Sequence, residues 1–120
     1  MANFRLAYAL GIALKMKAAV QHLAKSYPKE WNGKIKYHAF CADEIEQGWA
    51  IKIHHNNRVF SIAFTGVFPD KVKVYSGKGD LNYPGNVPPK SHDQKSFPAY
   101  DKDAVAKYIL TLIEEFFKEV

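Results

Sequence analysis

Lysine and histidine residues occupy alternate positions in three apolar segments of this sequence, 34–42, 49–55 and 70–76. Because neighbouring side chains of a β-strand point to opposite faces, residues at every second position share one face. Strands aligned in one sheet would therefore gather these positive charges on a single surface. The members of this predicted basic face are Lys34, Lys36, His38, Lys52, His54, Lys71, Lys73 and Tyr75.

A basic sheet face of this kind is suited to a negatively charged partner. Lysine neutralises a polyanion, and an aromatic ring can stack on a base. The alternative is that lysine fills exposed strand positions, where it keeps a protein soluble and blocks pairing at sheet edges. Lysine is depleted in strands by propensity, however, and its concentration on one face is more than solubility requires.

The other chemically active side chains form no convincing catalytic or metal site. We expect His38 and His54 to be near neighbours on adjacent strands, but no third ligand accompanies them. Cys41 falls in a strand pattern, which is typical of a buried and inert thiol. His92 and Asp93 form an acid–base pair only if a nucleophile lies near them, and none is evident. We therefore predict no catalytic residue, no metal and no cofactor.

The segment 49–65 is predicted to form a β-hairpin. Two alternating apolar runs flank Asn56-Asn57, and asparagine tolerates the positive φ angles of a two-residue primed turn. Such a turn fixes the register, and a slip of one residue would mix the apolar and polar faces. The predicted pairs are His55 with Arg58, Ile53 with Phe60, Ile51 with Ile62, and Trp49 with Phe64.

A long helix is predicted for residues 3–26, ending before Pro28 because the residue preceding proline avoids the α region. Apolar residues recur in it at spacings of three and four, which predicts a stripe that faces the core. The stripe consists of Tyr8, Ile12, Met16, Ala19 and Leu23, with Ala9, Ala13 and Val20 beside it.

The back of this helix is also apolar in its first half, so we expect something to cover it. Two occupants fit: a second copy of the chain, or the chain's own long loop. The small residues would let another backbone come close. The predicted self-association face comprises Phe4, Ala7, Leu10, Gly11 and Leu14.

The rest of the chain completes one α+β domain spanning residues 1–120. Further strands are predicted at 34–42 and 70–76, and a second helix at 102–119. Residues 77–100 lack periodicity and are rich in glycine and proline, which predicts a long irregular loop. Short links favour an antiparallel meander of four strands, with both helices covering its apolar face in two layers.

Composition narrows the classes of protein that this chain can represent. The net charge is +5 and the pI is about 9.3, which favours an acidic partner. Lysine accounts for 15 of the 17 basic residues, and arginine is the better reader of bases and phosphates. The single cysteine indicates a reducing compartment, and no run is long enough to span a membrane. We expect a cytoplasmic protein.

These observations lead to three functional hypotheses. The first is a small non-enzymatic binding or regulatory module, such as an adaptor, inhibitor or immunity protein, which engages an acidic protein through the basic face and the long loop. The second is sequence-independent binding of nucleic acid or nucleotides. The third is a small enzyme whose site is formed by the loop and the strand histidines. The sequence fixes neither the identity of the partner nor the oligomeric state, although a homodimer through the first helix is a candidate.

Overall fold

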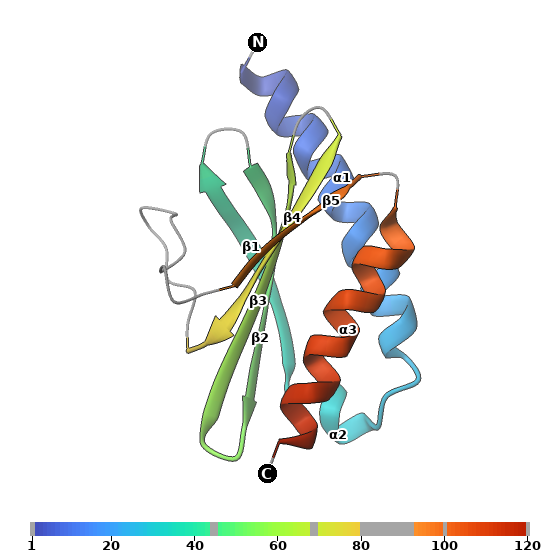
Figure 1. The fold of residues 1–120 in the computed structure, drawn as a ribbon, viewed down its shortest axis with the longest axis vertical. Coiled ribbons are helices and arrows are strands. Elements are labelled where there is room, and N and C mark those ends of the chain that lie inside the picture. Colours follow the sequence, from blue (N-terminus) through green and yellow to red (C-terminus); the bar gives the residue numbers. More distant parts are fainter. Residues whose placement is uncertain (1, 44–45, 68–69, 80–92, 100, 120) are drawn as a thin grey trace.

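The structure, a computed structural model, describes residues 2–43, 46–67, 70–79, 93–99 and 101–119, with the backbone alone for 2–6, 41–43 and 46–47. It consists of two long helices, one short helix and five strands (Figure 1). The elements in chain order are α1 (Ala2–Ala24), α2 (Lys29–Asn32), β1 (Ile35–Asp43), β2 (Glu46–His55), β3 (Arg58–Val67), β4 (Lys71–Lys78), β5 (Asp93–Pro98) and α3 (Lys102–Lys118).

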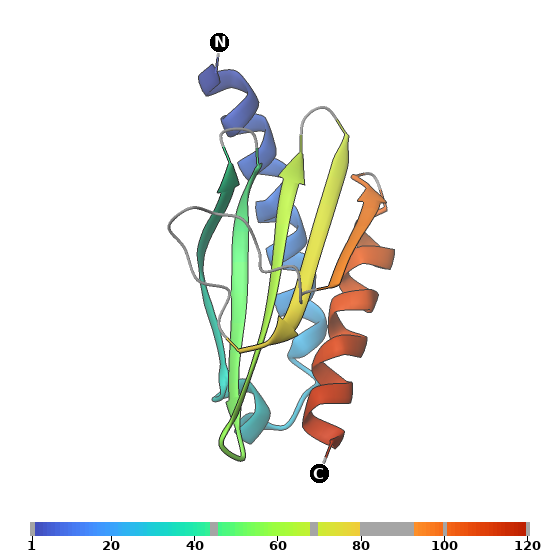
Figure 2. The same cartoon turned by 60° about the vertical axis from the view of Figure 1, so that its left-hand side comes forward.

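The fold has two layers. Both long helices lie on the same face of the sheet, and α1 packs against β2, β3 and α3 (Figure 2). The first turns of α1 extend past the end of the sheet in both views (Figures 1 and 2). The α+β prediction is confirmed. No described helix combines the length and the apolar character that crossing a membrane requires.

The sheet is an antiparallel meander in which the strands follow the order of the chain, β1-β2-β3-β4-β5. The prediction of a structureless segment at 77–100 is wrong at both ends, because β4 continues to Lys78 and β5 begins at Asp93. β5 lies at an edge of the sheet and buries little, with Phe97 alone partly covered. Because β5 buries so little, its sequence lacks the alternation of apolar and polar residues that would indicate a strand. Residues 80–92 of the predicted loop lie outside the described residues.

The central hairpin has the predicted register. Asn56 and Asn57 both have positive φ, 52° and 60°, as a primed two-residue turn requires. His55 pairs with Arg58, and the pattern continues through the full length of β2 and β3. All four predicted pairs are present, including Trp49 with Phe64 at the far end.

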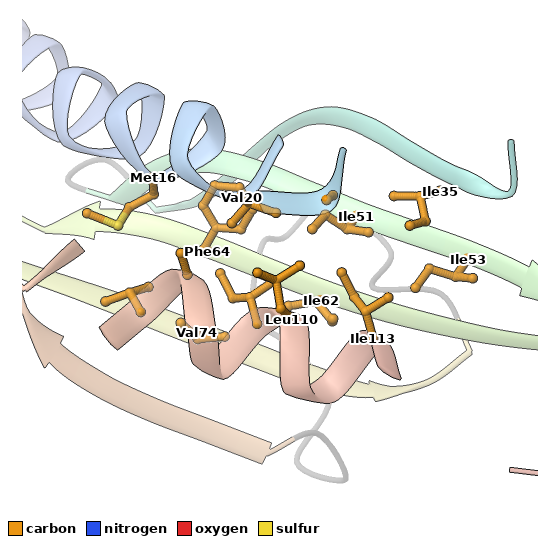
Figure 3. Packing of buried hydrophobic residues seen from close by; sticks show 14 of the residues in the cluster. Met16, Val20, Ile35, Ile51, Ile53, Ile62, Phe64, Val74, Leu110 and Ile113 are labelled. Atoms are coloured by element: carbon orange, nitrogen blue, oxygen red, sulfur yellow. The ribbon is translucent and has the colours of Figure 1, made fainter. Parts of the chain in front are cut away.

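The core lies between the helices and the sheet (Figure 3). Strand residues such as Ile51, Ile62 and Phe64 are fully buried there, and Met16 and Ile113 cover them from the helices. Residues 29–32, between α1 and β1, form the short helix α2. The Trp31 ring of α2 stacks on Phe117 of α3 with 4.5 Å between ring centroids, which closes one end of the core.

The predicted core stripe of α1 is rotated about the helix axis. Tyr8 and Leu23 were expected in the core, yet they are 44% and 39% exposed. The first half of α1 is apolar all round, so its sequence marks the buried side only weakly. The residues that are buried along α1 are Ala9, Ala13, Met16, Val20 and Ala24.

Candidate functional site

The sheet surface opposite the two long helices, which we call the open face, is turned toward the viewer in Figure 2. On it, Lys36 of β1 lies directly opposite Lys52 of β2. His38 and His54 each lie two residues from this pair, toward opposite ends of the strands. Lys52 is half-buried and the other three are exposed. We call Lys36, His38, Lys52 and His54 the basic corner.

The pairing of Lys36 with Lys52 opposes two like charges on neighbouring strands. Side chains that face each other in this way have Cβ atoms only about 4.5–5.5 Å apart, and like charges in such a pair destabilise a sheet. An anion lying across β1 and β2 would interact favourably with both ammonium groups. This pair is the most concentrated positive charge that the register produces on the open face.

The two histidines of the basic corner do not form a metal site. His38 lies opposite Ala50, and Ala50 is four residues from His54 along β2. The expectation that the histidines lie close together is therefore wrong. Among the described residues, no group of three His, Cys, Asp or Glu side chains is placed to hold a metal ion.

Lys71 and Lys73 lie on β4, well away from the basic corner. Lys73 and Lys52 are two strands and four residues apart, which is about 17 Å at ordinary strand spacings. By the same spacings Lys71 lies about 25 Å from Lys36. The Debye length is about 8 Å at physiological ionic strength, so the two groups act separately. Lys71 and Lys73 are therefore not part of the basic corner.

The centre of the open face is an apolar cluster. Tyr75 of β4 was predicted to be displayed for stacking, but it is only 2% exposed. Its ring meets Phe40 of β1 edge to face, with 6.1 Å between centroids. The strands between them carry Ala50 and Ala63, which are small and buried in the same cluster. Small residues on β2 and β3 thus leave room for two rings from β1 and β4 to meet.

Lys34 does not join the basic corner either. It precedes β1, and its Nζ lies 2.8 Å from Nδ1 of His55, whose ring packs against Phe116 and Phe117 on the helix side. An ammonium group only donates, so Nδ1 accepts and the ring proton resides on Nε2. Burial lowers the pKa of His55 below its usual value, and the positive charges of Lys34 and Arg58 lower it further, against the opposing effect of Glu30.

The lowered pKa of His55 predicts a dependence of stability on pH. The unfolded chain takes up a proton on His55 near pH 6.5, whereas the folded chain does so only at lower pH, so acidification through this range favours unfolding. His55→Gln should reduce the loss of thermal stability between pH 7 and pH 5. An NMR titration should place the His55 pKa below 6.5, and Lys34→Gln should raise it. Identical pH profiles for the wild type and His55→Gln would contradict this assignment.

Arg58 joins the tip of the central hairpin to the end of α3. Its guanidinium donates to the side chain of Glu119 at 2.8 Å, and to the backbone oxygens of Glu119 and Phe116 at 2.8 and 3.3 Å. It also lies over the Phe116 ring, 4.7 Å from the centroid. The last carbonyl groups of a helix lack partners within the helix, and Arg58 satisfies them. This arginine therefore has a structural role.

The predicted self-association face lies on the outer side of α1. Leu14 is 46% exposed and Ala7 is exposed, while Leu10 and Gly11 are half-buried. The alternative, in which the chain's own long loop covers this face, concerns residues 80–92, which lie outside the described residues. The side chain of Phe4 lies outside the described residues. Association of two copies through this face stays a prediction.

A cleft of about 200 Å³ lies between the ends of β3, β4 and β5 and α3. Asp93, Glu115 and Glu119 line it together with Ser76 and Lys78, and none of its described lining residues is a histidine or a cysteine. The histidines of the basic corner lie on the open face instead, and His92 and the side chain of Cys41 lie outside the described residues.

Sequence reasoning missed the outer edge of β1. β1 is the first strand of the meander and pairs only with β2 among the described strands. It is nine residues long, and Lys36 and His38 of the basic corner lie on it. The predicted meander itself contained the signal, because the first strand of a sequentially ordered sheet lies at an edge.

Comparisons with models of protein families, with curated proteins and with solved structures find no match for this chain.

Proposed function

We propose that this chain is a small non-enzymatic binding module that engages an acidic protein partner through the basic corner. The observation that supports the proposal is the direct opposition of Lys36 and Lys52, flanked by the exposed His38 and His54. The site lies on the open face of the sheet, and the two long helices pack on the other face. A partner can therefore dock there without disturbing the packing of the helices.

The type of basic residue supports a protein partner over sequence readout. The basic corner contains lysine and histidine but no arginine, and lysine acts as a point charge without the planar fork that reads a guanine edge. Scattered carboxylates on an acidic protein are suitable partners for such point charges. Sequence-independent binding of nucleic acid uses the same charges and remains the second hypothesis, which the experiment below separates.

Replacing Lys36 and Lys52 together with glutamine should weaken binding of poly-L-glutamate by roughly threefold to tenfold, because exposed ion pairs contribute up to about 1 kcal/mol each. Binding by the wild type should fall as salt rises from 50 to 200 mM. The melting temperature of the double variant is measured as a check that it is folded. Fluorescence anisotropy against salt measures the first two results.

The matched control replaces Lys107 and Lys118 with glutamine. Both are exposed on α3, so the variant has the same net charge as the first one and an unchanged open face. If both double variants lost the same affinity for polyglutamate, net charge alone would attract the anion, and this result would contradict the proposal. A duplex DNA of matched charge serves as the second probe, and tighter binding of DNA than of polyglutamate would favour the nucleic-acid hypothesis.

A further inference from the structure

Among the described residues, the outer side of β1 has no partner strand, and this edge lies next to the basic corner. β1 lies at one end of the strand order, and no described helix or other strand lies along its outer side (Figure 2). An exposed edge of this kind is a template for pairing with another extended chain. Which backbone groups face outward follows from the register of the central hairpin.

A two-residue hairpin closes on a pair of residues that exchange both of their backbone hydrogen bonds, here His55 and Arg58. Hydrogen-bonded and non-hydrogen-bonded pairs then alternate along an antiparallel ladder. Ile53 therefore bonds to β3, whereas Lys52 and Ala50 direct their backbone groups away from β3 and toward β1.

The partners of these residues on β1 complete the assignment. Lys36 lies opposite Lys52 and His38 lies opposite Ala50, so both use their backbone groups to bond to β2. The alternate residues Ile35, Tyr37 and Ala39 then direct their N–H and C=O groups to the outer side of the sheet. Three alternate residues of this edge thus direct their backbone groups to a side where no described strand lies.

The opposite edge of the sheet is less suited to pairing. β5 has six residues against nine in β1, and it ends at Pro98, which has no backbone N–H. Asp93 and Lys95 add exposed charges of both signs along it. Short, charged and proline-ended strands are the usual means by which proteins protect a sheet edge.

The side chains of β1 define what an added strand should carry. Residues opposite Lys36 and His38 would form non-hydrogen-bonded pairs, in which Cα atoms come within about 4.5 Å and side chains are closest. Acidic side chains at those positions would meet the basic corner. The intervening positions would face Tyr37 and Ala39 on the helix side. Tyr37 is half-buried, and its aromatic ring suits an apolar neighbour.

We propose that the outer edge of β1 accepts an extended segment of an acidic protein as a sixth strand. Acidic residues at alternate positions would face Lys36 and His38, and apolar residues would face Tyr37 and Ala39. This inference rests on the proposed function and specifies its partner. A second copy of the chain fits less well, because antiparallel pairing of two β1 strands would bring lysine and histidine against lysine and histidine on the open face.

The test uses a labelled ten-residue peptide that alternates valine with glutamate, and a control peptide with five valines followed by five glutamates. The protein variant is Ala39→Pro, which removes an outward N–H from an exposed residue and leaves the bonds to β2 in place. The wild type should prefer the alternating peptide, and Ala39→Pro should weaken that binding by about tenfold, the effect of one backbone hydrogen bond.

Two controls keep this result independent of folding. His38→Pro removes an N–H that bonds to β2, so it should lower the melting temperature much more than Ala39→Pro does. With the wild-type protein, N-methylation of alternate peptide amides should abolish binding when it falls on the bonded edge of the peptide. If methylation of neither set of amides weakened binding, the inference would be overturned even if Ala39→Pro did not fold.

The outcomes separate this inference from the proposed function. If Lys36→Gln weakens binding of the alternating peptide and Ala39→Pro does not, the basic corner binds acidic partners without strand addition and the inference is overturned. If neither substitution changes the affinity, the proposed function fails as well. A doubled mass in solution that Ala39→Pro restores to that of a monomer would identify a second copy as the occupant, which also overturns the inference.

Discussion

Replacing Phe64 with alanine should lower the free energy of unfolding by about 3–5 kcal/mol, the usual cost of removing a fully buried phenylalanine ring. Phe64 lies on the middle strand of the sheet with no exposed surface (Figure 3). Met16 and Val20 of α1 and Leu110 of α3 belong to the same buried cluster. Truncation would therefore leave a cavity that both helices would have to move to fill. Urea unfolding, with the slope of the transition checked for constancy, measures the loss.

The matched control is Phe60→Ala, on the same strand and the same face of the sheet. Phe60 is only half-buried, and its ring stacks on Phe116 with 5.3 Å between centroids. It should cost less than Phe64→Ala, because part of the ring is already in water and the site can collapse from the open side. A loss below about 1 kcal/mol for Phe64→Ala would contradict the assignment of this face to the core.

The register of the central hairpin could be predicted from sequence because two independent signals agree. The period of two assigns each residue to a face, and Asn56-Asn57 fixes the length of the turn. Moving the turn by one residue would place Phe64 and its neighbours on the open face. Only one register of the hairpin therefore satisfies both the turn and the burial pattern.

The buried side of α1 could not be fixed in the same way. Ala9 and Ala13 are buried, whereas the larger Tyr8 and Leu14 beside them are exposed. A prediction that places the largest apolar side chains in the core is therefore wrong for this helix. Small residues are buried here because α1 lies close to the sheet. The distance between α1 and the sheet depends on the strands beneath the helix, so it cannot be predicted from the sequence of the helix alone.

The candidate site was predictable only in part, for a related reason. Alternation assigns Lys36, Lys52 and Lys73 to one face, but it does not say how far along the sheet each one lies. That distance depends on the offset between strands, which separates Lys73 from the other two. Alternation also does not predict side-chain contacts that cross strands, such as the edge-to-face contact between the rings of Tyr75 and Phe40.

Replacing Gly66 with alanine should cost about 1–3 kcal/mol, because the new methyl group would be forced into a packed interface. A Cβ atom built at this position overlaps the backbone oxygen of Ala9 and lies 2.9 Å from Cβ of Ile12. The atom in the way belongs to a helix backbone, which a side-chain rotation cannot move. α1 would have to shift away from β3, and the burial of Ala9 and Ala13 would loosen with it.

Gly11→Ala is the matched control, since it adds the same methyl group to α1 at a site where nothing lies within 4 Å. Alanine is favoured over glycine inside a helix by roughly 0.5–1 kcal/mol, so this variant should be more stable than the wild type. The two substitutions are chemically identical and should change the unfolding midpoint in opposite directions. If Gly66→Ala were as stable as the wild type, α1 could not lie as close to β3 at Gly66 as the structure shows.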